Sequence, residues 1–457
     1  MKAEENPFGY RPIAQLLRQL AIPAVVANLV NALYNIVDQI FIGQGVGFLG
    51  NAATNVAFPM TTICLSLGLM VGIGSASKFN LELGRKNSLL ARKAAGTAAV
   101  SLVLIGLVLC LLMRLFLEDM LVAFGATEMI LEYAKTYTGI TSLGIPFLLF
   151  SLGTNPLVRA DGAAKYSMVA IIIGAVLNTV MDAWFIFGFG WGIAGAAWAT
   201  VISQMVSALV LMLYFRRFKS VSFDVKDFYP DWRMLLTICS LGMASFVFQS
   251  SNVLVQIVMN NALKIYGAAS AYGAEIPIAV AGIVAKVNVI FIAVVIGIVQ
   301  GSQPILSFNY GARAYSCVQE TIRVALKAVS FFSLVCWIGF ELFPKQILAL
   351  FGTGDALYTS FGIRYMRLFF LFAIINGIQI FSATFFPSIG KPKLGAIISL
   401  VKQLGLIIPL VLVLPMVFGV EGLVFAIPIA DLVSFFLAAY LLWRQYRLLE
   451  VYKNTLV

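Results

Sequence analysis

The chain has 457 residues, of which 61% are hydrophobic and only 11% are charged. An average soluble domain carries about 25% charged residues, and the mean hydropathy of this chain is +0.96. These proportions leave too little polar surface to cover a soluble fold of this length. The composition therefore excludes a soluble enzyme, a disordered chain and a secreted disulfide scaffold, and it predicts a polytopic membrane protein.

Continuous apolar segments recur along the chain, each long enough to cross a bilayer, which takes roughly 20 residues. A transmembrane β-barrel is disfavoured because its strands alternate apolar and polar residues over segments of about ten residues. Residues 8–20 precede the main part of the first segment and are expected to lie at the membrane surface as an amphipathic lead-in. The expected spans are 17–42, 52–77, 94–117, 133–155, 166–189, 192–214, 234–262, 275–303, 322–343, 361–386, 396–417 and 421–443.

The basic residues indicate the orientation of these spans. With the N-terminus placed in the cytoplasm, most of the 31 Lys and Arg residues fall in cytoplasmic loops. The positive-inside rule then predicts a multi-pass membrane protein with cytoplasmic N- and C-termini. The same bias explains the net charge of +11 without a nucleic-acid partner.

A charged central segment divides the chain into two halves of six spans. Gly192-Ile193-Ala194-Gly195 in the first half corresponds to Gly419-Val420-Glu421-Gly422 in the second, and two other pairs of segments keep nearly the same separation. An even number of spans gives both halves the same orientation, so we expect an all-α protein with two pseudo-symmetric lobes facing a central cleft, as in transporters. The expected units are an N-terminal cytoplasmic or interfacial segment (1–16), a first lobe (17–215), a cytoplasmic linker (216–233), a second lobe (234–443) and a cytoplasmic tail (444–457).

Few charged residues are expected deep inside the spans, where each costs roughly 2.5–3.5 kcal/mol on insertion scales. Asp38 lies in the first span and Asp182 in the fifth. In the first span, Asn28, Asn31, Asn35 and Asp38 step by three or four residues, so they share one face of the helix.

The fifth span repeats this polar pattern. Asn178 and Asp182 are four residues apart and point the same way, and Tyr137 and Thr200 add hydroxyls from neighbouring spans. This set of oxygens suits a hard cation such as Na⁺ or a proton shared between carboxylates. The sequence predicts a coupling site for Na⁺ or H⁺, with a purely structural polar cluster as the alternative. Its expected members are Asp38, Asn178, Asp182, Thr200, Tyr137 and Asn31, of which Asp38, Asn178, Asp182 and Thr200 are the expected Na⁺ ligands.

Other polar residues are candidates for a substrate cavity or for a second-lobe cluster. Lys286 is the deep base of the eighth span and is expected to be either a second-lobe counter-charge or a snorkelling base. Asp431 is expected to pair with Lys402 or to support packing, with contact to substrate or ion as the alternative. The candidates are Tyr34, Asn35, Gln256, Lys286 and Asp431.

Catalysis is not expected. The chain has no histidine, and its five cysteines are far apart in sequence, so a zinc site is not predicted. No nucleophile and base stand in a recognisable pattern. We expect no cofactor apart from the coupling ion.

Several motifs together resemble the multidrug and toxic compound extrusion (MATE) transporters, in the bacterial MepA-like and DinF-like branch, over nearly the whole chain. The segments on which this resemblance rests are residues 22–24 (IPA), 34–43 (YNIVDQIFIG), 159–162 (RADG), 177–182 (LNTVMD), 188–197 (GFGWGIAGAA) and 301–305 (GSQPI).

The resemblance implies a fold of twelve helices in two six-helix lobes and export of lipophilic, often cationic compounds by antiport against Na⁺ or H⁺. It implies that the cation site of the family falls on Asp38, Asn178, Asp182 and Thr200, with Tyr137 in the surrounding network. Some relatives use acids in spans 7 and 10, whereas span 7 here carries Gln256, so a second-lobe carboxylate mechanism is not expected. The partners implied are small lipophilic cations and the bilayer, and we expect a monomer.

Three other classes of membrane protein are alternatives, and the sequence favours each of them less. A flippase or exporter of lipid-linked or other endogenous amphiphiles would need a basic cavity, and Lys286 is the clear deep base. A major-facilitator-type transporter would carry a characteristic Asp-Arg loop after span 2, which residues 77–86 lack. An ion channel would need a selectivity motif, and none is evident.

Overall fold

The computed structural model describes residues 7–273, 275–351 and 356–455, and these residues form helices and connecting turns. Eleven of its helices are long and apolar enough to cross a membrane, and one bent pair of shorter helices makes a further span. The expected twelve-span, all-helical architecture is therefore confirmed.

The first six spans come from eight α-helices. The fourth span is assembled from α5 and α6, which follow the short α4, and the fifth ends in a π-helical segment at Ala183–Gly188. The helices are α1 (Ile13–Gly45), α2 (Phe48–Gly84), α3 (Ser88–Leu115), α4 (Leu117–Ala123), α5 (Glu128–Thr141), α6 (Ile145–Ala160), α7 (Ala164–Asp182) and α8 (Gly192–Tyr214).

The last six spans follow the same plan. The tenth span is the bent pair α13 and α14, which meet at 44°, and the eleventh contains a π-helical segment at Val401–Ile407. The helices are α9 (Trp232–Ala268), α10 (Glu275–Gly311), α11 (Tyr315–Leu342), α12 (Pro344–Ala349), α13 (Ala356–Phe369), α14 (Ala373–Ser388), α15 (Pro392–Leu400), α16 (Ile408–Phe418) and α17 (Val420–Thr455).

Helix α1 begins earlier than the sequence analysis expects. Residues 13–20 continue α1 instead of lying apart at the membrane surface, because Leu16, Leu17 and Leu20 are buried in a hydrophobic cluster that includes second-lobe residues such as Val318. The apolar face that looks like a surface anchor in the sequence is thus covered by protein.

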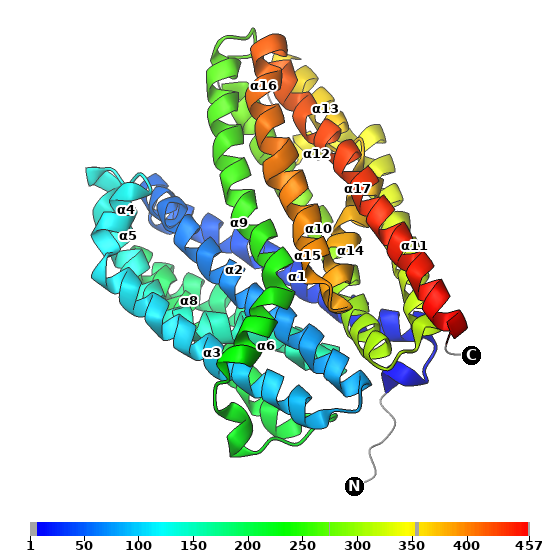
Figure 1. Ribbon diagram of the computed structural model, residues 1–457. Helices are drawn as coiled ribbons and strands as arrows, with labels where there is room; N and C mark the ends of the chain where they lie inside the picture. The colour runs from blue at the N-terminus through cyan, green and yellow to red at the C-terminus, as the bar shows by residue number, and fades with distance from the viewer. Residues whose placement is uncertain (1–6, 274, 352–355, 456–457) are drawn as a thin grey trace.

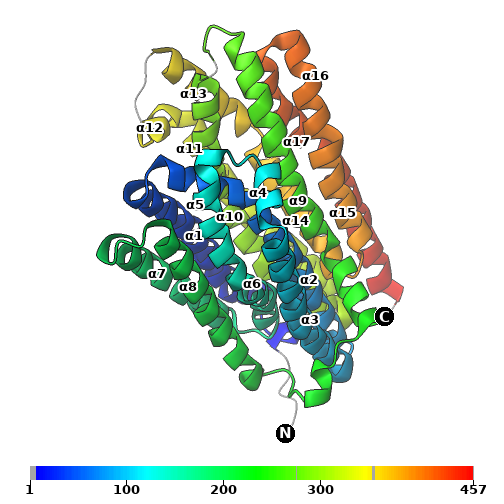
Figure 2. The ribbon, with the colours of Figure 1, turned by 90° about the vertical axis from the view of Figure 1, so that its left-hand side faces the viewer.

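The two halves of the chain form two lobes (Figure 1). The blue-to-teal helices α1–α8 make the first lobe, and the green-to-red helices α9–α17 make the second. The beginning of α1 and the end of α17 lie near the same end of the bundle, together with the linker that follows α8, as Figure 2 also shows. We call this the linker end.

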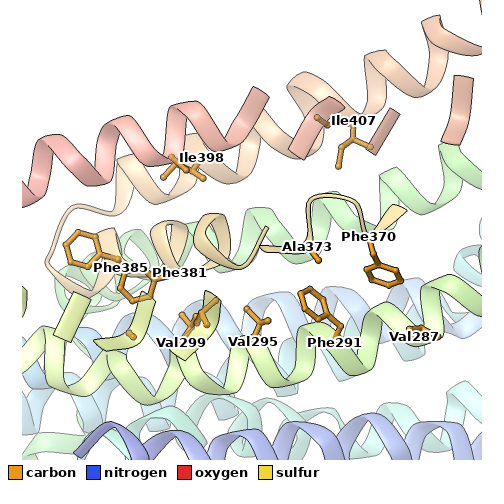
Figure 3. Packing of buried hydrophobic residues seen from close by; sticks show 14 of the residues in the cluster. Val287, Phe291, Val295, Val299, Phe370, Ala373, Phe381, Phe385, Ile398 and Ile407 are labelled. Atoms are coloured by element: carbon orange, nitrogen blue, oxygen red, sulfur yellow. The ribbon is translucent and has the colours of Figure 1, made fainter. Parts of the chain in front are cut away.

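The core of the second lobe is built around one face of α10. Val287, Phe291, Val295 and Val299 step by four residues, so they form a single stripe, and they are buried with Phe381 of α14 in one cluster (Figure 3). In a membrane, such packing is stabilised by van der Waals contacts between the side chains. The stripe leaves the opposite face of α10 free to meet the first lobe.

The lobes meet along two helix pairs, α1 with α10 and α2 with α9. At the crossing of α2 and α9, a methyl group on Gly74 would collide with the Ile238 backbone, and one on Gly242 would collide with the Met70 backbone. Only glycine permits this approach of the two backbones. The contact therefore depends on residues without side chains.

The inter-lobe contact weakens towards the other end of the bundle. Asn28 of α1 donates hydrogen bonds to Ala293 O (3.3 Å) and Gln300 Oε1 (3.4 Å) of α10. Two turns further along the same faces, Asn35 on α1 and Lys286 on α10 are exposed. The lobes therefore separate beyond Asn28, away from the linker end.

Candidate functional site

The two deep acids of the first lobe come together. Asp38 of α1 and Asp182, the last residue of α7, are both buried, and their carboxyl groups interact directly. Asp182 is followed by the π-helical segment at Ala183–Gly188, a widened turn of the kind often found at functional sites. Helix packing thus joins two charges that lie far apart in the sequence.

Amide and hydroxyl groups surround this pair. Asn178 Nδ2 donates a hydrogen bond to Thr200 Oγ1 (3.4 Å), which links α7 to α8. The hydroxyl of Tyr137 from α5 interacts with Thr200 and lies near both carboxyl groups. We call Asp38, Asn178, Asp182, Thr200 and Tyr137 the carboxylate cluster.

The acceptor oxygens of this cluster outnumber its donors. Asp38 Oδ1, Asn178 Oδ1 and both Asp182 oxygens are buried and accept no hydrogen bond from the described part of the chain. Buried polar atoms are normally paired, and two carboxylates in contact repel each other unless a proton or cation intervenes. The donor set fits Na⁺, with Asp38, Asn178, Asp182 and Thr200 as its ligands, and it equally fits a shared proton.

Three further candidates from α1 take different positions. Tyr34 lies close to Asp38 and Asp182 and so borders the carboxylate cluster. Asn31 and Asn35 are exposed, and Asn35 Nδ2 donates to Asn31 O (2.7 Å) along the helix. These two side chains therefore lie outside the buried set, although the spacing predicts a common face.

A second polar cluster lies in the second lobe. Lys402 Nζ is 2.7 Å from Asp431 Oδ1 and donates hydrogen bonds to Asn376 Oδ1 and Gln379 Oε1, both at 2.9 Å. Gln379 in turn donates to Ser434 Oγ (2.7 Å). The lysine ammonium thus sits among three oxygens, in the way a bound cation would, and the expected pairing of Asp431 with Lys402 is present.

The remaining second-lobe candidates are exposed. Gln256 on α9 and Lys286 on α10 have exposed side chains, whereas Asp431 is buried. The sequence analysis missed Asn376 and Gln379 as partners of Lys402. Their spacing of three residues within an otherwise apolar span was a usable signal, because it puts both carboxamides on one face of α14.

Comparison with known proteins identifies the family of this chain. The sequence profile of the MatE family matches residues 23–184 and, a second time, residues 252–413. The chain belongs to the MatE family. The double match also accounts for the internal repeat seen in the sequence, since each lobe corresponds to one copy of the profile. A MatE family protein is a membrane transporter and not an enzyme.

Curated relatives of this MatE family chain cover nearly its full length. It is 24% identical over 455 residues to the multidrug export protein MepA of Staphylococcus haemolyticus (strain JCSC1435), with 98% of each chain covered. It is also 24% identical over 429 residues to MepA of Staphylococcus aureus (strain N315), with 93% and 92% covered.

Solved structures show the same fold. The chain superimposes on a multidrug resistance MATE family transporter in an outward-facing conformation with a TM-score of 0.90 and 22% identity, over 99% of this chain and 100% of that one. A transporter from Pyrococcus furiosus gives a TM-score of 0.89 at 22% identity with the same coverage. The two-lobe MATE fold is therefore shown.

Proposed function

We propose that this MatE family transporter is a cation-coupled antiporter that exports lipophilic, often cationic compounds by alternating access of its two lobes. The observation that carries the proposal is the contact between the buried carboxyl groups of Asp38 and Asp182, in which Asp38 Oδ1 and both Asp182 oxygens lack a donor among the described residues. Two acids in contact at bilayer depth cost free energy. Binding of a coupling ion gives this arrangement a function.

The coupling step follows from charge. Two adjacent carboxylates become tolerable when a proton or Na⁺ neutralises part of their charge. An ion that binds one arrangement of the lobes more tightly than the other shifts the equilibrium between them by that difference in affinity. Asp38 on α1 and Asp182 on α7 respond to the same ion, and α1 also contacts the second lobe through α10.

The substrate class rests on the relatives and on charge complementarity. The MepA proteins are named as multidrug export proteins. Beyond the inter-lobe contact, apolar side chains such as Ile63 on α2, which is 43% exposed, offer surface for a lipophilic guest, and the carboxylate cluster offers negative charge. We expect no resident cofactor and a monomeric transporter.

The linker end is proposed to face the cytoplasm of a bacterial cell. Basic residues gather in the loops at this end, and such loops remain on the cytoplasmic side. Labelling of a cysteine introduced at Tyr229, which is exposed, tests this in a chain without its native cysteines. Labelling by an impermeant maleimide in inverted vesicles but not in intact cells is the expected result, and the reverse pattern refutes the orientation.

The central experiment is ethidium efflux from proteoliposomes that contain the purified protein. A Na⁺ gradient and a proton gradient are imposed separately, and the active gradient identifies the ion. Asp182→Asn and Asp38→Asn are each expected to reduce gradient-driven efflux by more than about fivefold, the lower bound of typical coupling energies.

Glu132→Gln is the matched control, because the side chain of this acid on α5 is 83% exposed and lies 3.9 Å from the basic Lys135. It should retain wild-type efflux. Undiminished driven efflux in Asp182→Asn, with normal expression and thermal stability, would refute the coupling site. Efflux under neither gradient would count against the drug antiporter.

The alternative is a flippase or exporter of endogenous amphiphiles. Lys286 favours this alternative. Its side chain continues the face of α10 that meets the first lobe, where it could bind an anionic head group. Lys402 adds little to such a site, since Asp431 and two carboxamides already engage its ammonium. Translocation of a fluorescent phospholipid without ethidium efflux in the same proteoliposomes would favour this alternative.

A further inference from the structure

Two of the sequence motifs, RADG at 159–162 and GSQPI at 301–305, are not used by the carboxylate cluster. They meet at a small cavity between the lobes, with a volume of about 10 Å³, near the linker end. Its lining comes from three helices, α2, α6 and α10, so both lobes contribute to it. The polar side chains considered below are Asn80, Arg159, Gln303 and Ser307.

Arg159 is the charged group of this cavity. It is only 4% exposed, and its Nη1 donates to Asn155 Oδ1 (2.7 Å). A guanidinium has five N–H donors, and the described part of the chain supplies Arg159 with this one side-chain acceptor and no ion pair. A buried charge of this kind is costly unless it is paired.

The acids closest to the cavity in sequence are engaged elsewhere. Glu82 pairs with Lys78 (2.7 Å) and Arg85 (2.9 Å). Asp161 accepts hydrogen bonds from the Tyr214 hydroxyl and from the backbone of the linker. Neither carboxylate neutralises Arg159, so its counter-charge has to come from outside the chain.

The neighbours of Arg159 in the cavity are further donors without acceptors. Asn80 Nδ2 on α2, Gln303 Nε2 on α10 and the Ser307 hydroxyl are buried and unpartnered among the described residues, together with the acceptor oxygen Asn80 Oδ1. Each of these residues is at least nine-tenths buried. A cationic guanidinium, two amide N–H groups and a hydroxyl around one small space form a donor set for an anion.

We propose that this cavity binds one small monovalent anion of halide size, which joins Arg159 and Asn80 of the first lobe to Gln303 and Ser307 of the second. A volume of about 10 Å³ admits a water-sized guest and excludes phosphate, sulfate and carboxylate substrates. Because the donors come from both lobes, the anion stabilises the arrangement in which the lobes are closed at the linker end.

The direct test is crystallography with bromide as the probe. Crystals of the full chain grown in NaBr should show an anomalous peak within the four-residue set. Arg159→Gln should abolish this peak, whereas Arg217→Gln, at an exposed arginine of the linker, should retain it. A cavity without a peak, or an equal peak in Arg159→Gln, overturns the proposal.

A solution test holds Na⁺ constant and compares NaCl, NaBr and sodium gluconate at equal concentration. The halides should raise the Tm of the wild-type chain relative to gluconate, and the shift should disappear in Arg159→Gln. If that variant does not fold, Gln303→Met is tested instead. This substitution removes a donor of the second lobe and should reduce the rise in Tm that the halides cause. Equal Tm values in all three salts overturn the proposal, since a bound water would show no halide dependence. Because Na⁺ is unchanged, the result is independent of the coupling ion.

Discussion

Individual residues show two ways of keeping charge at bilayer depth. Asp38 and Asp182 interact with each other without a basic partner among the described residues, and we propose that an exchangeable proton or ion neutralises them. Asp431 instead holds Lys402 at 2.7 Å and carries its own permanent counter-charge. This contrast explains why we assign coupling to the first lobe and a structural role to the second-lobe pair.

The second-lobe pair gives a prediction about stability. Lys402→Met removes the ammonium and leaves the Asp431 carboxylate buried without compensation, which typically costs about 3–5 kcal/mol. The Tm of the purified variant should fall strongly. Lys402→Met combined with Asp431→Leu should recover most of this loss because no unpaired charge remains. Equal Tm values for the single and double variants would contradict this account.

Among the connecting elements, the start of the linker after α8 is bound by the carboxylate of Asp161, while Arg92 and Lys93 of α3 pair with acids further along it. Asp161 accepts hydrogen bonds from Tyr214 Oη (2.7 Å), Lys219 N (2.7 Å) and Ser220 N (2.9 Å). Burial raises the pKa of Asp161, while these hydrogen bonds act in the opposite direction. The RADG motif thus anchors the linker with its acid and faces the inter-lobe cavity with its arginine.

Loss of this anchor should loosen the linker. Asp161→Ala removes all three bonds, and a typical hydrogen bond contributes about 0.5–1.5 kcal/mol to stability. Limited trypsin digestion at Arg216, Arg217 and Lys219 should become at least several-fold faster. Val225→Ala is the control within the linker, because its side chain is 80% exposed. Equal digestion rates for the two variants would refute the anchoring role.

At the scale of the whole molecule, the lobes are joined near the linker end and separate beyond it. Gly74 and Gly242 permit backbone contact between α2 and α9, and Gly84 and Gly311 do the same between α2 and α10. Small residues at helix crossings give close packing in a membrane, where the hydrophobic effect does not drive helices together. The glycines therefore favour one of the two arrangements that alternating access requires.

Adding a side chain at the crossing should shift this equilibrium. Gly242→Val places methyl groups against the Met70 backbone, so the lobes should move apart at the linker end. Spin labels at positions 89 and 316, in a chain without its native cysteines, should report longer distances. Gly339→Ala is the control because a methyl group there meets nothing within 4 Å. An unchanged distance distribution in Gly242→Val would show that the glycine contact does not set the lobe arrangement.

Much of the fold could be predicted because each span is long, apolar and separated by charged loops. The sequence also marks Asp38 and Asp182 as candidates for a functional role, because acids are costly in apolar segments. Residues 13–20 were harder, because an amphipathic face looks the same whether lipid or protein covers it. Asn31 shows the limit of periodicity, which places side chains on a face but does not say which part of that face is buried.

The sequence by itself determined the number of spans, the two-lobe repeat and the residue types that pay an energetic cost in the membrane, because hydropathy and charge are local properties of the chain. Only the tertiary structure decided which of these residues meet. It joined Asp38 to Asp182, enclosed Lys402 among three oxygens and brought Arg159 to Gln303 across the lobe boundary. The reason is physical: such contacts depend on how helices far apart in sequence cross, and side chains of many residues set those crossings together.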